Sequence, residues 1–487
     1  MKKPNLLFIY TDEQACNTLA AYGNPQICMP NLNRLARRSV VFEEAYVTQP
    51  VCTPSRSSLL TGLYPHTNGC TENNVPLKPE TMCLPEMLSG GGYVTAHYGK
   101  WHLGDELYAQ HGFQDWVGIE DGYNRWFTGG KDRSIRSGYH HFLIEHGLAP
   151  RNGKIFGREE AARFPEEFGK PAFIAREASR FLRANQKNPF VLYVNFLEPH
   201  MPYFGPRDAQ YDPRQMPLPA NFDAIPGAAQ PLKARLLQQH YRRQGHSGLP
   251  LANTSDWRRL IANYWGLCSL IDTHIGTILD TLDACGLSQN TIVVFTSDHG
   301  DMMGAHQLLA KCVMYQEAIR IPLMIRMPGQ AAGKRIASPV SQIDIVPTLL
   351  DLMGQPISNA LQGKSLRCRM DDPALTGARP VFVEWNGPNN GLGDKLGRTQ
   401  IPEWMSELAT REDIAAACTD PVRTVITAEG WKLNCSPLGE HELYNLRNDP
   451  CETENLVNQD RLLARELREQ ILMWQKQTGD VVVLPEL

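Results

Sequence analysis

The stretch VCTPSRSS around Cys52 combines residue types whose spacing suits anion chemistry. Thr53 can cap a helix, Pro54 suits its first position and Gly62 can end it, so Cys52 is expected just ahead of a helix N-terminus. That end of a helix favours anions and ionised nucleophiles, and we expect Arg56 in its first turn to hold an oxyanion formed at position 52. The alternative for an isolated cysteine is a buried residue without a chemical role.

Acidic side chains follow two continuous apolar runs of the chain. Asp12 and Glu13 come after the run NLLFIYT, and Asp298 and His299 come after the run TIVVFTS. An acid that follows a buried strand is costly to desolvate unless it has a partner. A divalent cation shared by these four side chains removes that cost, so the pattern predicts a metal site. Gln14 is the alternative to Glu13 as a ligand.

Two further apolar runs end in basic side chains. The run 93–99 leads to Lys100 and His102, and the run 189–198 leads to His200 between two prolines. The carboxyl ends of parallel strands open on one crevice, so these side chains are expected to meet the acidic ones there. Taken alone, a lysine after a strand is usually solvated, and a histidine between prolines is usually a loop residue.

The apolar runs and the segments between them indicate the elements that position these residues. Short runs rich in β-branched and aromatic residues are typical of parallel strands buried on both faces. Apolar residues at three- and four-residue spacing predict helices over 33–46, 176–185 and 256–286, the last ending at Gly286. We therefore expect the α/β class: a large, mostly parallel sheet flanked by helices on both faces.

One long segment differs in composition from these alternating elements. Residues 122–249 are rich in Tyr, Trp, His, Arg, Gly and Pro and have little periodicity, which predicts long surface loops. Such loops are where a substrate is usually selected. Further along the chain, residues 342–354 are expected to form a helix.

The C-terminal part of the chain indicates a second unit. Residues 422–436 predict two strands joined by a turn at Glu429-Gly430, and residues 460–477 predict a last amphipathic helix. We therefore expect a large α/β domain over 1–370 and a smaller C-terminal α+β subdomain over 371–487.

Composition limits the partners of the protein. Of its 487 residues, 42% are hydrophobic and 21% charged, which is enough to bury a large core. A formal net charge of -4 supplies no field for nucleic acid or an anionic membrane, so neither is expected as a partner. The N-terminal apolar run is too short for a signal peptide, and no run reaches the ~20 apolar residues of a membrane span, which predicts a cytoplasmic protein. The 12 cysteines form no CxxC pair and are expected to be mostly reduced and buried.

The motif CTPSR at 52–56 matches the C-x-P-S-R signature of type I sulfatases, and the resemblance extends in order over most of the chain. The other matching stretches are NLLFIYTDEQ at 5–14, LTGLYPHTNG at 60–69, GKWHLG at 99–104, FLEPHMPY at 196–203, FTSDHGDMMGAH at 295–306, Lys311 with YQEAIRIPLMIRMPG at 315–329, DIVPTLLDLMG at 344–354 and ELYNLRNDPCETENL at 442–456. The chain therefore resembles the formylglycine-dependent sulfatases of the alkaline-phosphatase-like superfamily. The resemblance implies that α/β fold with a C-terminal subdomain built on a small antiparallel sheet.

For Cys52 the resemblance implies oxidation after translation to formylglycine by a formylglycine-generating enzyme. In the hydrated aldehyde, one hydroxyl attacks sulfur and the other, once deprotonated, expels sulfate by re-forming the C=O bond. The implied reaction is hydrolysis of a sulfate ester to an alcohol and inorganic sulfate. The implied partner is a small-molecule or saccharide sulfate ester, and the sequence leaves the oligomeric state open.

The resemblance also implies one divalent metal ion. Asp12, Glu13, Cys52, Asp298 and His299 match its ligands, with Glu13 standing where the family usually has Asp or Gln. Oxygen ligands favour Ca²⁺, as in most of the family, while a histidine ligand also admits Mn²⁺.

The remaining polar residues match groups that contact the ester. Arg56 resembles the group that steadies the diol, and Lys100 and His102 resemble the pair that contacts diol and sulfate, with His102 as the base that starts sulfate release. His200 and Lys311 resemble the pair at the bridging oxygen, one of which protonates the departing alcohol. Together these groups would stabilise a charged transition state.

Three alternative functions remain open on the sequence. A phosphonate monoester or phosphodiester hydrolase has the same fold and aldehyde, but the Lys100-x-His102 pair favours a sulfatase. A cysteine phosphatase has a longer Cys-to-Arg spacing and no metal, which the clustered carboxylates argue against. A non-catalytic binder of sulfated glycans would keep the pocket with Cys52 unconverted. The aromatic and basic residues of 122–249 suggest a polar, sugar-like or small cationic alcohol.

Overall fold

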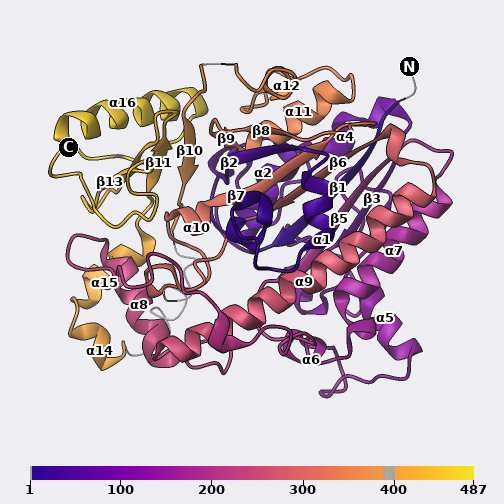
Figure 1. The fold of residues 1–487 in the computed structure, drawn as a ribbon, viewed down its shortest axis with the longest axis horizontal. Coiled ribbons are helices and arrows are strands. Elements are labelled where there is room, and N and C mark those ends of the chain that lie inside the picture. The colour runs from indigo at the N-terminus through magenta and orange to yellow at the C-terminus, as the bar shows by residue number, and fades with distance from the viewer. Residues whose placement is uncertain (1–2, 376, 388–391, 393–400) are drawn as a thin grey trace.

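The computed structural model describes residues 3–375, 377–387, 392 and 401–487. A nine-stranded sheet runs through its centre in the order β4-β3-β5-β1-β6-β7-β2-β8, with β9 paired to β2 (Figure 1). Its strands are β1 Asn5–Asp12, β2 Val40–Tyr46, β3 Val94–Gly99, β4 Asp115–Val117, β5 Phe190–Pro199, β6 Thr291–Ser297, β7 Arg320–Arg326, β8 Lys334–Ile336 and β9 Val340–Ser341. Because β4, β3, β5, β1 and β6 are parallel neighbours, the expected mostly parallel sheet is confirmed.

The prediction of a single helix over 33–46 is wrong in its second half. A helix, α1, covers Pro30–Ala36, but the following residues form β2. Strand β2 pairs antiparallel with β7, placing Val40 opposite Ile325, and β7 is also antiparallel to β6. The run VVFEEAY is rich in β-branched and aromatic residues, and sheet pairing outweighs its weak helical spacing.

Helices cover both faces of the sheet, as predicted (Figure 1). Along β1, Leu7 and Ile9 belong to one apolar cluster, while Leu6, Phe8 and Tyr10 belong to the other. This alternation is the period of a strand whose two faces are both buried.

Each apolar cluster has its own helices. Helices α7 (Lys170–Ala184) and α9 (Thr254–Ala284) pack against each other and contribute Ile174 and Ile271 to the first cluster. Helices α2 (Cys52–Thr61) and α11 (Ile345–Leu352) contribute Leu59 and Leu349 to the second. The helices expected over 176–185, 256–286 and 342–354 are confirmed, the last after a short 3-10 turn, η9 (Gln342–Asp344).

The segment 122–249 contains more regular structure than its composition predicts. Besides α7 and β5 it forms most of η4 (Asp121–Trp126), together with α5 (Gly138–Glu145), α6 (Arg158–Ala161) and α8 (Leu232–Gln244). Helix α8 is the clearest departure from the predicted loops. Its sequence is strongly charged, but Leu236 and Leu237 are buried on one side, so tertiary packing stabilises it.

The remaining short helices connect these larger elements. They are η1 Cys16–Thr18, η2 Ala20–Tyr22, α3 Pro65–Asn68, α4 Leu84–Met87, η3 Ser89–Gly91, η5 Glu166–Phe168, η6 Pro213–Gln215, η7 Ser288–Asn290, η8 Ala305–Gln307, α10 Gln316–Ile319, α12 Arg367–Asp371, α14 Glu403–Ser406 and α15 Arg411–Thr419. Across the described residues, no helix combines the length and apolarity needed to cross a membrane.

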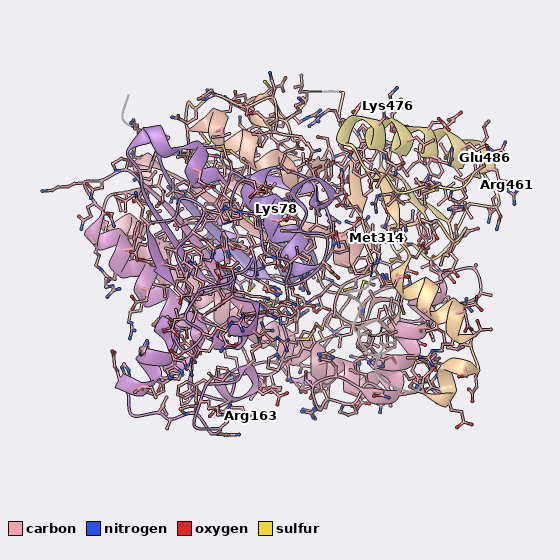
Figure 2. All side chains as sticks on the ribbon, turned by 180° about the vertical axis from the view of Figure 1, so that it is seen from behind. Lys78, Arg163, Met314, Arg461, Lys476 and Glu486 are labelled. Carbon is pink, nitrogen blue, oxygen red and sulfur yellow. The ribbon has the colours of Figure 1, made fainter. Side chains whose placement is uncertain are left out.

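A separate antiparallel sheet lies at the C-terminal end of the molecule, as expected (Figure 1). Its order is β10-β11-β12-β13, formed by Val381–Glu384, Arg423–Ile426, Trp431–Cys435 and Glu442–Asn445. The predicted turn lies between β11 and β12, where Gly430 has φ +87. The last helix, α16, covers Arg461–Thr478, and Figure 2 shows Arg461 and Lys476 at this outer edge of the molecule.

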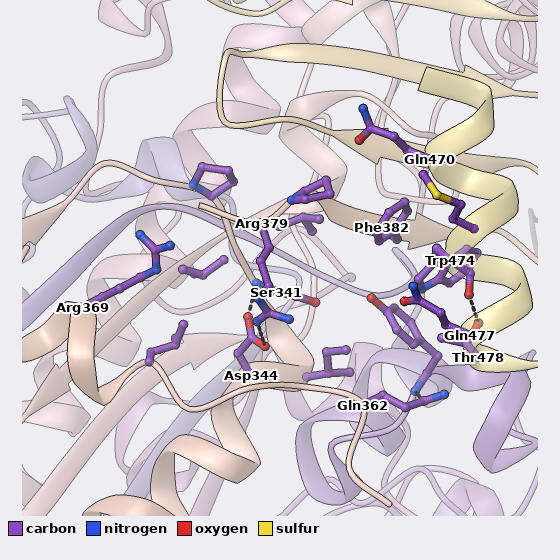
Figure 3. A pocket seen from close by; sticks show the side chains of 18 residues that line it. Ser341, Asp344, Gln362, Arg369, Arg379, Phe382, Gln470, Trp474, Gln477 and Thr478 are labelled. Atoms are coloured by element: carbon purple, nitrogen blue, oxygen red, sulfur yellow. Dashed lines mark hydrogen bonds and ion pairs between the residues drawn. The ribbon is translucent and has the colours of Figure 1, made fainter. Parts of the chain in front are cut away.

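The small sheet shares apolar contacts with the large one. Val381, Val383 and Trp385 belong to the same buried cluster as Phe8 of β1. A pocket of about 560 Å³ lies at the junction, between η9, β10 and α16 (Figure 3). The domain boundary between residues 370 and 371 stays a prediction.

Candidate active site

Cys52 is the first residue of α2, and the residue before it is extended and provides no side-chain cap. The prediction that Thr53 caps this helix and Pro54 opens it is therefore wrong. Thr53 lies inside the helix and donates its hydroxyl to the carbonyl of His102 at 2.7 Å. The predicted end is confirmed, because Gly62 has φ +68 at the C-cap. Cys52 consequently lies at the positive end of a helix, close to the end of β3.

The carboxyl ends of four neighbouring strands bring the predicted residues together. Asp12 ends β1, Lys100 follows β3, His200 follows β5 and Asp298 follows β6. These strands stand side by side in the order β3-β5-β1-β6. Every predicted site residue is buried, with an exposed fraction of at most 8%.

Arg56 binds two carboxylates of this cluster. Its Nη2 donates to Asp12 Oδ2 at 2.8 Å, and its Nε donates to Asp298 Oδ2 at 2.9 Å. Its Nη1 donates to the carbonyl of Lys100 and to Asn195 Oδ1. The guanidinium therefore fixes one oxygen of each carboxylate, and Asp298 Oδ1 accepts the backbone N–H groups of Glu13 and His299.

Four side chains, those of Asp12, Cys52, Asp298 and His299, form a group that fits a metal ion. Their ligand atoms all lie within 4.8 Å of one another. His299 Nε2 is 3.3 Å from Cys52 Sγ, 3.8 Å from Asp12 Oδ1 and 3.6 Å from Asp298 Oδ1. The other ring nitrogen, Nδ1, lies 3.0 Å from the carbonyl of Gly300, which orients the imidazole.

The pKa values in this group indicate that it would bind a cation favourably. Burial alone would lower the pKa of His299, but Asp298 and Cys52 raise it to about 9. Burial alone would raise the pKa of Asp12, but Lys100 and other nearby cations hold it well below its usual range. The carboxylate of Asp12 is therefore ionised and attracts a cation, which a divalent metal would supply.

Glu13 lies outside the four-residue group. Its Oε2 accepts a hydrogen bond from Lys311 Nζ at 2.6 Å and is 3.5 Å from His200 Nε2. Burial raises the pKa of Glu13 to about 8, although Lys311 lowers it. The alternative ligand, Gln14, donates its amide to Thr18. Glu13 thus contacts the pair of basic residues, and its assignment as a metal ligand stays a prediction.

Lys100 and His102 contact the cluster in different ways. Lys100 Nζ donates to Asp12 Oδ2 at 2.5 Å. His102 Nε2 is 3.1 Å from Asn74 Oδ1, and its Nδ1 has no hydrogen-bond partner within the described part of the chain. Glu106 accepts the backbone N–H of His102, whose φ is +61. Burial, with Lys100 adding to it, lowers the pKa of His102 well below its usual range, so its imidazole is neutral and can accept a proton.

Sequence reasoning missed the residues that support this cluster. Asn195, inside β5, donates to the carbonyl of Tyr10 and accepts from Arg56. Asp301 accepts hydrogen bonds from the Tyr203 hydroxyl at 2.6 Å and from the backbone N–H of Ala310, the residue before Lys311. The sequence did contain a signal for Asn195, because this residue is a single polar amide within an otherwise apolar run. Tyr203 comes from a segment far from Asp301 along the chain, and the sequence carries no signal for their contact.

Fold and site together define a hydrolase of anionic esters with an alkaline-phosphatase-like fold. Its strand ends hold carboxylates that could bind a metal ion, a buried cysteine and several basic side chains. The sequence model described as Sulfatase matches residues 4–355. The chain belongs to the sulfatase family and is a sulfuric ester hydrolase.

Two relatives illustrate this membership. An ulvan-active sulfatase of Formosa agariphila is 31% identical over 389 residues, covering 78% of this chain and 68% of the relative. A multifunctional alkaline phosphatase superfamily protein, PehA, of Trinickia caryophylli is 30% identical over 516 residues, covering 99% and 96% of the two chains.

Solved structures show the same fold. A phosphonate monoester hydrolase from Silicibacter pomeroyi superposes with a TM-score of 0.79 at 22% identity, covering 98% of this chain and 96% of that one. A structure in complex with its substrate D-glucosamine-2-N,6-O-disulfate gives a TM-score of 0.73 at 22% identity, covering 98% and 99%. At this level of identity the likeness concerns the fold alone.

Family membership implies a divalent metal ion and a modified cysteine. The group of Asp12, Cys52, Asp298 and His299 offers a possible site for the ion.

Proposed function

We propose that this protein releases sulfate from a sulfated saccharide, with residue 52 acting in its formylglycine form. The observation that carries the proposal is the position of Cys52. It starts a helix, its sulfur lies 3.7 Å from an Asp12 oxygen and 3.3 Å from His299 Nε2, and basic side chains surround it. The ulvan-active relative and the neighbour bound to a disulfated glucosamine support a saccharide substrate. A formylglycine-generating enzyme would be the maturation partner.

The proposed metal is Ca²⁺, held by Asp12, Asp298, His299 and residue 52. Two carboxylates favour calcium, whereas the imidazole would also suit Mn²⁺. When bound, the ion would neutralise negative charge on the sulfate and on the nucleophile.

The protein's own side chains would contact two parts of the ester, the sulfate group and the bridging oxygen. Lys100 and His102 would hold the sulfate, with the neutral His102 accepting a proton from residue 52. Lys311 and His200 would face the bridging oxygen, where Lys311 stabilises charge and one of the two protonates the alcohol.

The test is sulfate release by protein co-produced with a formylglycine-generating enzyme. Sulfated mono- and disaccharides, choline sulfate and aryl sulfates form the substrate panel, and a Cys52→Ala variant is the control. We expect turnover of at least one saccharide sulfate that Cys52→Ala lacks. Failure of the converted, metal-loaded protein to hydrolyse any sulfate ester would overturn the proposal.

Hydrolysis of phosphonate monoesters is a second candidate. The 30% identity to PehA, described as a multifunctional member of the superfamily, supports an activity besides sulfate hydrolysis, and a phosphonate monoester hydrolase shares the fold. The Lys100 and His102 pair favours sulfate instead. Comparing kcat/KM for an aryl sulfate, a phosphonate monoester and a phosphodiester separates the two, and a clear preference for phosphorus would favour this candidate.

A further inference from the structure

Two side chains from the segment 122–249 lie beside His102. The ring of Tyr123, in η4, has its centroid 4.6 Å from that of the imidazole. Arg158, the first residue of α6, donates from Nη2 to the Tyr123 hydroxyl at 2.7 Å. The guanidinium is therefore separated from His102 by a single side chain, at the edge of the proposed sulfate position.

Arg158 and a second cation, Lys170, bind the same carboxylate. The carboxylate of Glu120 is shared by Arg158 Nε, at 2.6 Å, and by Lys170 Nζ. Burial alone would raise the pKa of Glu120, but these two cations hold it at about 2. A second carboxyl, Glu198, interacts with both cations, but burial raises its pKa to about 7, so at neutral pH it offsets only part of their charge.

Arg158 is the accessible member of this charged group. Its side chain is 28% exposed, whereas those of Glu120 and Lys170 are 5% and 4% exposed. Within the described residues, its hydrogen bonds use Nε and Nη2, so Nη1 remains available to a ligand. The contacts with Glu120 and Tyr123 hold the guanidinium in place, which lowers the entropy lost when it binds an anion.

We propose that Arg158 binds a second anionic group of the substrate, a carboxylate or another sulfate on the saccharide whose sulfate ester lies at Cys52. This inference rests on the proposed function, which defines where the ester lies. The charged guanidinium can donate from Nη1 to either oxyanion, so the substrate class is an acidic sulfated saccharide.

The test compares three saccharides: N-acetylglucosamine 6-sulfate, glucosamine-2-N,6-O-disulfate, and 6-sulfated N-acetylglucosamine linked to glucuronate. We expect kcat/KM to favour the two doubly anionic sugars, and Arg158→Gln to reduce that preference about 10- to 100-fold. Arg158→Lys should retain part of it, because it keeps the charge without the planar fork. The disulfate and glucuronate arms show which anion is preferred.

Arg163→Gln is the matched control. Its guanidinium lies over the ring of Phe204 at 4.3 Å, and Figure 2 shows this residue at the outer edge of the molecule. An unchanged preference in Arg158→Gln, or an equal loss on all three sugars, would overturn the inference.

Equilibrium binding in a Cys52→Ala background separates this inference from the proposed function. Binding that prefers the doubly anionic sugars and depends on Arg158, combined with no turnover by the converted enzyme, would overturn the proposed function alone. Turnover without an Arg158-dependent preference would overturn this inference alone.

Discussion

His200 and Lys311, the two basic residues that contact Glu13, differ in charge. Burial lowers the pKa of His200 well below its usual range, and Lys311 adds to the effect. Burial alone would also lower the pKa of Lys311, but Cys52 and Glu13 raise it well above its usual range. Lys311 is thus a fixed cation, whereas His200 can take up a proton when an anion binds beside it. His200 would protonate the departing alcohol only after this uptake, which the negative charge of the bound sulfate ester would favour.

Replacing His200 by Ala should therefore affect esters according to their leaving group. Loss of a general acid costs about 10²- to 10⁴-fold in kcat/KM for a saccharide sulfate, whose alkoxide leaves poorly. The loss should be smaller for 4-nitrophenyl sulfate, because its phenolate is a better leaving group and depends less on protonation. The measurement is kcat/KM over a series of leaving groups, with His141→Ala on the exposed surface of α5 as control. Equal losses across the series would contradict this role.

At the residue scale, the sequence located the side chains that follow strands but not the residues that support them. Asp12, Lys100, His200 and Asp298 could be found because buried parallel strands end at one edge of a sheet. The capping role of Thr53 could not be judged, since its hydroxyl partner, the carbonyl of His102, lies far along the chain.

At the scale of elements, the junction between β3 and Lys100 depends on Gly99. This residue has φ +120, and a Cβ placed on it would lie 1.9 Å from the carbonyl oxygen of Asn195. Only glycine fits so close to a neighbouring strand in this conformation. The close approach of β3 to β5 therefore sets the position of Lys100.

A Gly99→Ala variant should lower both stability and activity. The clash and the unfavourable φ should lower the free energy of unfolding by about 1–3 kcal/mol and displace Lys100. Denaturant unfolding and kcat measure the two effects. Gly129→Ala is the control, because nothing lies within 4 Å of its Cβ position and its φ is not in the left-handed region. Equal behaviour of the two variants would contradict this role of Gly99.

The loop after β3 depends on the buried carboxyl of Glu106, which accepts the backbone N–H groups of Trp101 and His102. Burial raises the pKa of Glu106 to about 7, although these hydrogen bonds lower it. The pKa of Glu106 is therefore higher in the folded state than in the unfolded state, where it is about 4.5. The protonated carboxyl contributes stability that is fully present below pH 4.5 and is lost as the pH rises through 7.

Glu106→Gln should remove this pH dependence. We expect the free energy of unfolding of the variant, minus that of the wild type, to rise by about 3 kcal/mol from pH 4.5 to pH 7.5. Urea unfolding at both pH values measures the difference, with the exposed Glu80→Gln as control. A constant difference between wild type and Glu106→Gln would contradict the raised pKa.

Among the elements, the parallel strands and long helices were predictable, because their periodicity spans many residues. Strand β2 was not, since its apolar spacing also suits a helix and only its pairing with β7 decides between them. Helix α8 was predicted as a loop because its sequence is strongly charged and only one side of the helix is buried.

At the scale of the whole molecule, the two sheets share buried contacts. The backbone N–H of Glu384 donates to the carbonyl of Thr48, only a few residues from Cys52. Arg423 and Asp480 form a buried ion pair at 2.7 Å inside the C-terminal unit. Because β10 belongs to the apolar cluster of the large sheet, neither unit buries its surface alone.

We therefore expect residues 1–370 and 371–487 to unfold together. Calorimetry of the full chain should show a single transition, and truncation after residue 370 should give an aggregating product because it exposes the partners of Val381 and Trp385. Two separate transitions in the full chain would contradict this coupling.

Removal of the metal should destabilise the protein and abolish its activity. A chelator would leave Asp12 and Asp298 without a divalent partner, and an ion present at 100 times its dissociation constant contributes about 2.7 kcal/mol of stability. Melting curves with and without chelator, followed by addition of Ca²⁺ or Mn²⁺, measure the loss and identify the ion that restores it. An unchanged melting temperature and rate after complete removal would contradict the metal site.

Catalysis by the aldehyde is tested by relating the rate of sulfate release to the fraction of residue 52 that carries it. Preparations with different degrees of conversion can be made by varying the co-produced formylglycine-generating enzyme. Mass spectrometry of the peptide containing residue 52 gives the converted fraction, since formylglycine is lighter than cysteine by about the mass of one water molecule. We expect the rate to be proportional to this fraction and to vanish with it. A rate that does not depend on the fraction would contradict catalysis by formylglycine at residue 52.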